Sequence, residues 1–338
     1  MLAYQTRRTA YRFFTSSCRQ RHENPLVCLG LPRSGAPSPP QMPRRTGPIQ
    51  KRPIPNVKRV VAVASGKGGV GKSTVAVNLA FALSSFRPPD SAARLRVGIL
   101  DLDIFGPSIP TLMGLQNSEE PLLTSGGAIV PLMNHGIPTM SMGFLLPRAP
   151  DSGSTNDTPV VWRGLMVQKA VQQLLFDVDW AAAGNGLGLD VLVVDMPPGT
   201  GDVPLTLGQL VVVNGTVIVS TPQDVALADV SKGIAMLRKV AVPITGIVLN
   251  QSHFICPGCE ARHHLYGPPE AFHATASRLG VDILAELPLV PGVSKGGDAG
   301  LPYGLLSSNK DGDQGGRGGN EWLEDMRLVA EKVWCKVG

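Results

Sequence analysis

A glycine-rich segment at residues 66–74 constrains this chain more than any other feature. Its sequence, GKGGVGKST, fits the G-x-x-x-x-G-K-[ST] pattern of phosphate-binding loops. A β-branched run at 58–64 precedes it, and an Ala-, Val- and Leu-rich run at 74–83 follows it. A buried strand, a glycine loop and a helix start together aim backbone N–H groups at one point, which suits a polyphosphate. The segment therefore predicts a P-loop that binds a nucleoside triphosphate.

Three side chains of this loop are candidates for contact with nucleotide or Mg²⁺. Lys72 is expected to reach the β- and γ-phosphates, and Ser73 is expected to bind Mg²⁺. A second lysine, Lys67, is not required by the generic pattern. Its alternative interpretation is a solvated surface lysine.

Carboxylates follow two of the predicted strands. Asp195 ends the apolar run 191–194, the Walker B form, and is expected near Mg²⁺. Asp101 and Asp103 end the predicted strand 95–100, and at i and i+2 they point to the same side of an extended chain. This pair is suited to ordering a metal-bound water and the attacking water. The alternative is that these aspartates only form turns.

Two further segments complete the predicted nucleotide site. Residues 196–202, MPPGTGD, predict a stiff loop whose N–H groups sense a γ-phosphate. Asn250 follows the apolar run 247–249 and offers a donor and an acceptor, which is enough to read the edge of adenine. A turn-forming asparagine is the alternative for that residue.

The order of elements predicts the fold class. Further strands are expected at 190–194, 215–220, 243–249 and 281–285, and helices at 163–178, 225–239, 269–279 and 321–336. Residues 115–140 are expected to hold a small hairpin, 148–158 a loop and 307–320 a flexible insertion. This alternation predicts an α/β fold: a single domain (56–338) with a doubly wound, mainly parallel sheet and its ligand at the carboxyl ends of the strands.

The N-terminal region differs in charge from the rest. Residues 1–55 hold nine Arg and one Lys against a single acid, Glu23, whereas the whole chain carries +5, so the remainder is net acidic. Residues 1–33 intersperse Arg with Phe, Ser and Thr and lack an apolar core, which predicts a mitochondrial presequence. The proline-rich residues 34–55 predict a disordered linker. No apolar run reaches the length of a membrane span.

Among the five cysteines, Cys256 and Cys259 form the only close pair, CPGC. A [4Fe–4S] cluster needs four cysteines, so a symmetric dimer that pools two pairs would complete the set. One alternative is a zinc site made with His263 and His264. A redox CxxC pair and a structurally inert pair are the others.

Eight segments occur in an order that resembles one family. They are GKGGVGKST (66–74), DLDIFGPSIP (101–110), VWRGLM (161–166), VVDMPPGTGD (193–202), STPQD (220–224), VLNQS (248–252), CPGC (256–259) and ELPL (286–289). The set resembles the Mrp/Nbp family of iron–sulfur carrier ATPases, which are deviant-Walker-A P-loop NTPases related to MinD and ParA. The leader and VWRGLM make the mitochondrial NUBPL branch the most similar.

The resemblance implies an ATPase with ATP, Mg²⁺ and a [4Fe–4S] cluster as ligands. It implies that residues 66–74, that is Gly66, Lys67, Gly68, Gly69, Val70, Gly71, Lys72, Ser73 and Thr74, hold phosphate and Mg²⁺. It implies that Lys67 acts on the nucleotide of a partner subunit, that Asp103 orients water, and that Asp101, Asp195 and Asn250 complete the site.

The resemblance also implies a homodimer in the mitochondrial matrix that transfers clusters to apoproteins, including those of respiratory complex I. It allows peripheral association with the inner membrane and implies no nucleic-acid partner. The competing function is a MinD/ParA-like positioning switch with a structural zinc. That switch would require a basic or amphipathic C-terminal helix, and residues 321–336 mix acids and bases instead. A metabolic kinase or ligase is the third class.

Overall fold

The computed structural model describes residues 50–89, 91, 93–145, 164–182, 186–306 and 316–338. All of them belong to one compact unit, Ile49–Gly338. The predicted presequence, residues 34–49 of the predicted linker, the loop at 148–158, the start of VWRGLM and residues 307–315 lie outside the described residues.

The core of this unit is an eight-stranded sheet with the strand order β10-β7-β6-β1-β5-β2-β4-β3. Seven strands are parallel to their neighbours and the edge strand β3 is antiparallel to β4. The bounds are β1 Val57–Ser65, β2 Val97–Asp101, β3 Leu132–Asn134, β4 Ile137–Ser141, β5 Leu189–Asp195, β6 Gly215–Ser220, β7 Gly246–Leu249 and β10 Ile283–Glu286. The doubly wound, mainly parallel sheet is therefore confirmed.

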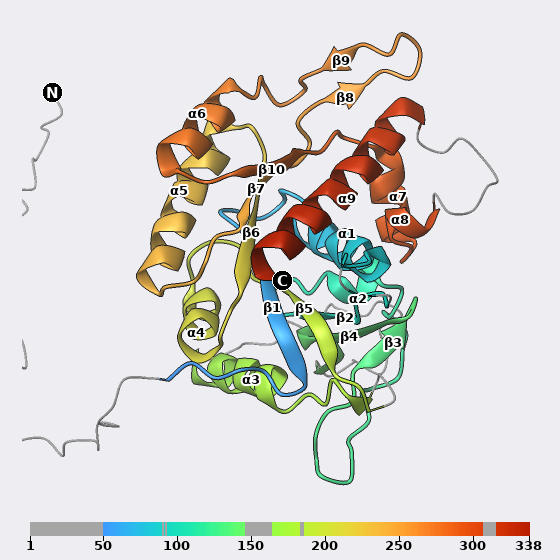
Figure 1. The fold of residues 1–338 in the computed structure, drawn as a ribbon, viewed down its shortest axis with the longest axis vertical. Helices are drawn as coiled ribbons and strands as arrows, with labels where there is room; N and C mark the ends of the chain where they lie inside the picture. The colour runs from blue at the N-terminus through green and yellow to red at the C-terminus, as the bar shows by residue number, and fades with distance from the viewer. Residues whose placement is uncertain (1–49, 90, 92, 146–163, 183–185, 307–315) are drawn as a thin grey trace, which may run out of the picture. The chain divides into compact units, whose positions relative to one another are not determined.

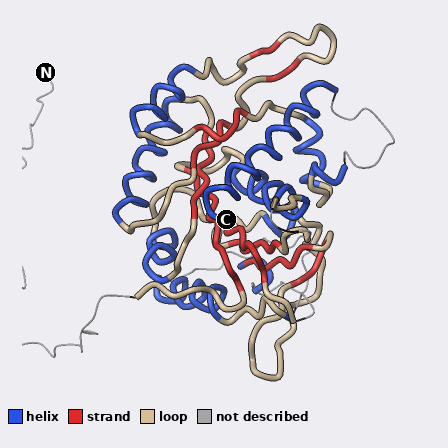
Figure 2. Tube along the Cα trace, viewed as in Figure 1, coloured by secondary structure: helices blue, strands red, loops and turns tan. Residues whose placement is uncertain are grey.

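Helices cover both faces of the sheet (Figure 1). On one side lie α1 Lys72–Ser85, α2 Ile109–Leu112, α7 Pro291–Asp298, α8 Tyr303–Leu306 and α9 Gly316–Val337. On the other lie α3 Gly164–Phe176, α4 Asp202–Leu210, α5 Asp224–Lys239 and α6 Glu270–Leu279. A short 3-10 turn, η2 Met142–Leu145, follows β4. Figure 2 shows the strands enclosed between these two sets of helices.

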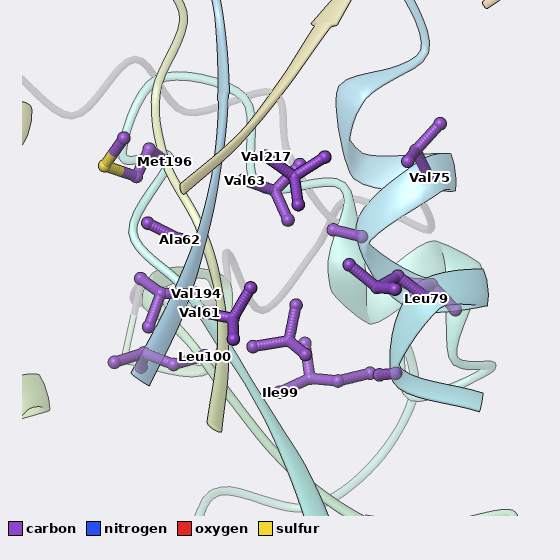
Figure 3. Packing of buried hydrophobic residues seen from close by; sticks show 14 of the residues in the cluster. Val61, Ala62, Val63, Val75, Leu79, Ile99, Leu100, Val194, Met196 and Val217 are labelled. Atoms are coloured by element: carbon purple, nitrogen blue, oxygen red, sulfur yellow. The ribbon is translucent and has the colours of Figure 1, made fainter. Parts of the chain in front are cut away.

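The central strands are buried on both faces, which explains their continuous β-branched sequences. Val61, Ala62 and Val63 of β1 are fully buried between flanking strands and helices. Figure 3 shows Val61 and Val63 on the side of Val75 and Leu79 of α1, and Ala62 on the opposite side of the strand, toward Met196. The helix that follows the P-loop is therefore held rigidly against the strand that precedes it.

Short strands and helices outside the sheet position the cysteine pair and the loop ends. β8 Phe254–Ile255 and β9 Arg262–His263 form a separate two-stranded hairpin that carries Cys256 and Cys259.

Helices α4 and α7 were not predicted. Their internal glycines and prolines obscure the helical pattern, but Pro291 occupies the first turn of α7, where a missing N–H costs nothing.

The predicted flexible insertion at 307–320 is wrong for its last five residues, because α9 begins at Gly316. Glycines oppose helix formation intrinsically, but tertiary packing overrides that preference here. A Cβ at Gly319 would lie 2.3 Å from the hydroxyl of Tyr303, so this close approach requires glycine.

The predicted disordered linker is wrong for residues 50–55. Arg52 forms a parallel bridge with Val211, and its guanidinium lies 3.5 Å from the ring centroid of Phe176. Lys51 Nζ donates to the carbonyl oxygens that follow α5, at Val240 and Ala241. Ile54 is only 2% exposed. The prolines therefore shape an ordered strap.

We expect Ile54→Ala to lower the free energy of unfolding by about 2–5 kcal/mol, because it leaves a cavity at a buried site. Urea denaturation monitored by circular dichroism measures this. Gln50→Ala, at an exposed position of the same strap, is the control and should change stability by less than about 0.5 kcal/mol. Equal stability of the two variants would contradict the assignment of the strap to the folded core.

Candidate functional site: a nucleotide site and a cysteine hairpin

The predicted P-loop connects the end of β1 to the start of α1. Gly69 and Gly71 adopt φ angles of 78° and 81°, which favour glycine. A Cβ at Gly71 would lie 2.3 Å from Asn250 Nδ2, so this position also needs glycine for space. The loop backbone is therefore fixed by its own glycines and by Asn250, which directly follows β7.

Lys72, Ser73 and Asp195 form one hydrogen-bonded group. Lys72 Nζ lies 2.5 Å from Asp195 Oδ1, and Ser73 Oγ donates to Asp195 Oδ2 at 2.5 Å. Lys72 is 6% exposed and Asp195 is fully buried. Burial raises the pKa of the Asp195 carboxyl, and Lys72 and Ser73 oppose that rise. The loop lysine, the loop hydroxyl and the Walker B carboxylate thus meet as the sequence predicted.

This group fits Mg²⁺. The Ser73 hydroxyl and the Asp195 carboxylate supply oxygen ligands, which that ion prefers together with water and phosphate oxygens. An adjoining cavity of about 610 Å³ has room for a polyphosphate. Its lining comprises Ser65, Lys67, Gly68, Gly69, Gly71, Lys72, Ser73, Thr74, Asp103, Gly106, Pro107, Ser108, Thr111, Leu112, Pro198 and Asp298.

Asp101 and Asp103 have different surroundings. Asp103 lines the cavity, and burial raises its pKa. Asp101 is fully buried and accepts hydrogen bonds from the backbone N–H groups of Asp103 and Ile109 and from the Ser141 hydroxyl, at 2.9, 3.3 and 2.9 Å. Asp103 therefore faces the cavity, whereas Asp101 braces the loop behind it. The orientation of water by Asp103, and a nucleotide role for Asp101, stay predictions.

The register of the sheet explains the unusual environment of Asp101. It pairs directly with Asp195 of the neighbouring strand β5. Burial, together with the nearby charge of Asp195, raises the pKa of Asp101 to about 8. At neutral pH the Asp101 carboxyl therefore holds a proton, which reduces repulsion between the two carboxyls.

Asn250 and Lys67 are both anchored by contacts that the sequence did not reveal. Asn250 Nδ2 donates to the carbonyl oxygen of Val70 at 2.8 Å, so the observed role of Asn250 is to brace the P-loop. Contact with adenine stays a prediction. Lys67 Nζ donates to Gln223 Oε1 at 3.0 Å, and Thr221 Oγ1 donates to the same oxygen. The STPQD segment thus orients the second lysine of the loop.

The cysteine pair lies on the β8–β9 hairpin. The Cys256 N–H donates to Ala261 O at 3.0 Å and the Glu260 N–H donates to Cys256 O at 2.8 Å, which closes the turn. Cys259 is exposed and Cys256 is partly exposed. Hydrogen bonds from the backbone of Cys259 and Gly258 lower the pKa of the Cys256 thiol. A lowered thiol pKa favours the thiolate, which is the metal-binding form.

The single-chain zinc prediction is not supported. Within the described part of the chain, no group of three or more His, Cys, Asp or Glu side chains is placed to hold a metal ion. His264 Nδ1 instead contacts the carbonyl oxygen of Ser252 at 3.0 Å. The four ligands of that alternative, Cys256, Cys259, His263 and His264, are therefore not brought together in the described residues.

The geometry agrees with comparisons to known proteins. A family model described as "ParA: NUBPL iron-transfer P-loop NTPase" matches residues 56–315. This chain belongs to that family. The iron–sulfur cluster transfer protein NUBPL of Mus musculus is 46% identical over 262 residues, which cover 78% of this chain and 75% of that protein. An Arabidopsis thaliana relative, "Iron-sulfur protein required for NADH dehydrogenase, mitochondrial", is 44% identical over an alignment that covers 74% of this chain and 73% of the relative.

Solved structures support the same family and fold. A nucleotide-binding protein of Archaeoglobus fulgidus, in complex with ADP, gives a TM-score of 0.57 at 35% identity and covers 72% of this chain and 87% of its own. The cell division ATPase MinD of Pyrococcus furiosus gives a TM-score of 0.51 at 20% identity, and the superposition covers 82% of this chain and 98% of the MinD chain. At this identity the similarity shows the fold alone. The predicted resemblance and fold class are therefore confirmed.

We expect Lys72→Ala to weaken ATP binding at least about tenfold, because a charged contact to phosphate contributes ~1.5–3 kcal/mol. Isothermal titration calorimetry with Mg²⁺·ATP measures the affinity. Lys232→Ala removes an exposed lysine that pairs with Asp229 and is the matched control. Lys72→Met keeps the alkyl stem if the alanine variant is unstable. Unchanged affinity in a folded Lys72 variant would refute the phosphate-loop assignment.

Asp101 predicts a pH dependence of stability. Its pKa of about 8 in the folded chain exceeds the ordinary value of 3.8, so its stabilising contribution is complete below about pH 4 and is lost as the pH rises through 8. Without nucleotide, this group should lower the free energy of unfolding by about 1 kcal/mol per pH unit between roughly pH 5 and pH 7.

Asp101→Asn should remove this contribution. An amide cannot accept every hydrogen bond that Asp101 accepts, so the substitution also changes stability at every pH. The test is therefore the difference between the two proteins in how the free energy of unfolding changes with pH, measured by urea denaturation. The difference isolates Asp101 from the histidines that titrate in the same range. Identical slopes would show that Asp101 does not titrate as assigned.

Proposed function

We propose that this chain is an ATP-dependent carrier of a labile [4Fe–4S] cluster, which it holds across a homodimer and transfers to apoproteins. The observation that carries the proposal is the pair of the partly exposed Cys256 and the exposed Cys259, for which the described residues supply no third ligand. A cluster of this type takes four cysteines, and two copies of the chain supply them. The names of the relatives, cluster carrier or transfer proteins, support this cargo.

The nucleotide site supports ATP binding and weak hydrolysis. Lys72 is placed to neutralise phosphate charge, and Ser73 with Asp195 to hold Mg²⁺, which would polarise the terminal phosphate. Asp103 is placed on the cavity wall to orient an attacking water. Incoming phosphates compete with Asp195 for Lys72, so nucleotide binding would change the environment of the β5 carboxyl.

Lys67 supports the dimer. Gln223 holds its ammonium group at the mouth of the nucleotide cavity, which Lys67 itself lines. The chain has Lys72 for its own phosphates, so a second lysine here is available to the nucleotide of a partner subunit. ATP would then join two copies and bring their cysteine hairpins into one site.

The relatives suggest the setting. Since one relative is required for mitochondrial NADH dehydrogenase, we include the iron–sulfur subunits of that complex among the recipients. The mitochondrial matrix is the proposed compartment. In the described residues no helix is both long and apolar enough to cross a membrane.

The positioning-switch alternative is disfavoured by the packing of α9. Trp322, Met326 and Val329 of this helix are buried, and α9 packs on α1. Its apolar face is therefore used within the fold and is not offered to a membrane. The structural zinc of that alternative has no complete ligand set in the described residues.

Anaerobic reconstitution with iron and sulfide in the presence of Mg²⁺·ATP tests the proposal. We expect about four iron and four sulfide per two chains, with a dimer by native mass spectrometry, because one [4Fe–4S] cluster takes four thiolates. Cys256→Ala and Cys259→Ala should lose the cluster. Cys335→Ala, which removes an exposed cysteine of α9, should keep it. A monomer that binds one zinc and shows no charge-transfer absorbance would overturn the proposal.

A further inference from the structure

The hairpin of residues 254–263, here called the cysteine hairpin, makes no strand pairing with the main sheet. Its strands pair only with each other, through Phe254 with His263 and Ile255 with Arg262. Figure 1 shows it extending beyond the end of the sheet, near the start of α9. An isolated two-stranded hairpin is marginally stable at best in water. Contacts outside the hairpin must therefore set the direction in which its cysteines point.

Hydrophobic packing supplies only part of those contacts, through Ile255 of β8, which is buried where β8 meets α9. A cavity of about 920 Å³ separates part of the hairpin from the starts of α7 and α9. Cys256 and Pro257 border it on the hairpin side, and Pro291 and Arg317 border it on the helix side. Where this cavity lies beneath it, the hairpin has no packing against the helices, so polar contacts at its edge contribute to its orientation.

One carboxylate at the edge of that cavity supplies the strongest such contacts. Glu321 of α9 accepts hydrogen bonds from the Arg262 guanidinium, with Nη2 at 3.1 Å from Oε1 and 3.0 Å from Oε2. The same Oε1 lies 3.1 Å from His253 Nε2. Glu321 thus contacts the base of the hairpin on both sides, through Arg262 in β9 and through His253, which directly precedes β8.

His253 fixes the carboxylate to the body of the protein. It is buried, and its Nδ1 lies 2.8 Å from the Ser252 hydroxyl, which also lies 3.0 Å from Leu287 O. The Nε2 of His253 carries the hydrogen in the contact with Glu321, because a carboxylate can only accept. A buried histidine of the body on one side and an exposed arginine of the hairpin on the other make Glu321 the junction between the two.

A second, weaker contact lies one helical turn earlier. Arg317 pairs with Glu260 at 3.3 Å, and both side chains are more than half exposed. Exposed pairs contribute little to stability. In the Arg262–Glu321 pair the carboxylate is less exposed to solvent, because the Glu321 side chain is 23% exposed. Two contacts four residues apart on α9 therefore hold one face of the hairpin, and Glu321 is the main one.

We propose that Glu321 is a positioning residue for Cys256 and Cys259, acting through Arg262 and His253 to fix the direction in which the two thiols are presented. This rests on the proposed function, in which those thiols hold the cluster. A cluster bridged by two chains needs four thiolates that converge on one point, so two tilting hairpins would hold it loosely. Glu321 touches neither cysteine; it sets the orientation of the element that carries them.

Hydrogen exchange on the full-length, metal-free chain tests the positioning role without any cluster. The reporters are the hairpin amides of Cys256 and Glu260, which bond across the turn, compared with the amides of β1. We expect Glu321→Ala to speed exchange of the hairpin amides at least tenfold and to leave β1 unchanged. Glu324→Gln is the control, since Glu324 borders the same cavity but makes no hydrogen bond or ion pair to the hairpin within the described residues.

A charge exchange makes the test specific. Arg262→Ala should match Glu321→Ala, and the double variant Glu321→Arg with Arg262→Glu should restore slow exchange. Wild-type exchange in Glu321→Ala would overturn the proposal. Faster exchange throughout the molecule, β1 included, would also overturn it, because Glu321 would then be a general stabilising residue.

Cluster release gives the second readout. In reconstituted protein, Glu321→Ala should lose iron to an external chelator at least threefold faster than the wild type and Glu324→Gln. Equal release rates, together with an altered hairpin, would show that hairpin orientation does not matter to the cargo and would overturn the proposal. Failure of the wild type to bind any cluster would refute the proposed function instead, and the exchange experiment would still decide the positioning role.

Discussion

The buried ion pair between Lys72 and Asp195 is the interaction on which the nucleotide site depends. It ties the first turn of α1 to the end of β5, and neither side chain has appreciable contact with solvent. Removing one partner of such a pair leaves an uncompensated buried charge, which costs about 3–5 kcal/mol. The pair therefore holds the loop, the helix and the Walker B strand in one arrangement, while each charge remains available to a ligand of opposite sign.

The two sites share one short segment of chain. Asn250 braces the P-loop at Val70, and two residues later Ser252 begins the contacts that hold His253 and the cysteine hairpin. Helix α7 also spans both regions, because Pro291 borders the cavity by the hairpin and Asp298 borders the nucleotide cavity. The nucleotide and cysteine sites are therefore parts of one continuous framework.

The sequence predicted what is local. The P-loop, Asp195 and the parallel sheet follow from motifs and from runs of β-branched residues, and the structure bears out their arrangement. The strap at residues 50–55 was missed because prolines are typical of linkers, and its ordering comes from distant partners such as Phe176. The first turn of α9 was missed because three of its residues are glycines, whose helical state depends on packing against Tyr303.

The contacts around the cysteines were beyond sequence reasoning for a similar reason. Nothing in the residues around Glu321 distinguishes it from Glu324, and its importance arises only when the fold brings it to Arg262. The same holds for Ser141, which binds Asp101 from 40 residues away. Asn250 was predicted to contact adenine, which stays a prediction, and only the structure showed its contact with the loop backbone.

The distance along the chain between Arg262 and Glu321 has a consequence for biogenesis. The two residues are 59 positions apart, with the cysteines on the earlier side. Because synthesis delivers a chain progressively, Cys256 and Cys259 emerge well before α9, the helix that carries Glu321. The contacts between the hairpin and α9 therefore form only after α9 has been made; under the proposed function, loading with iron and sulfide would belong to the chain that has reached this stage and not to an earlier nascent one.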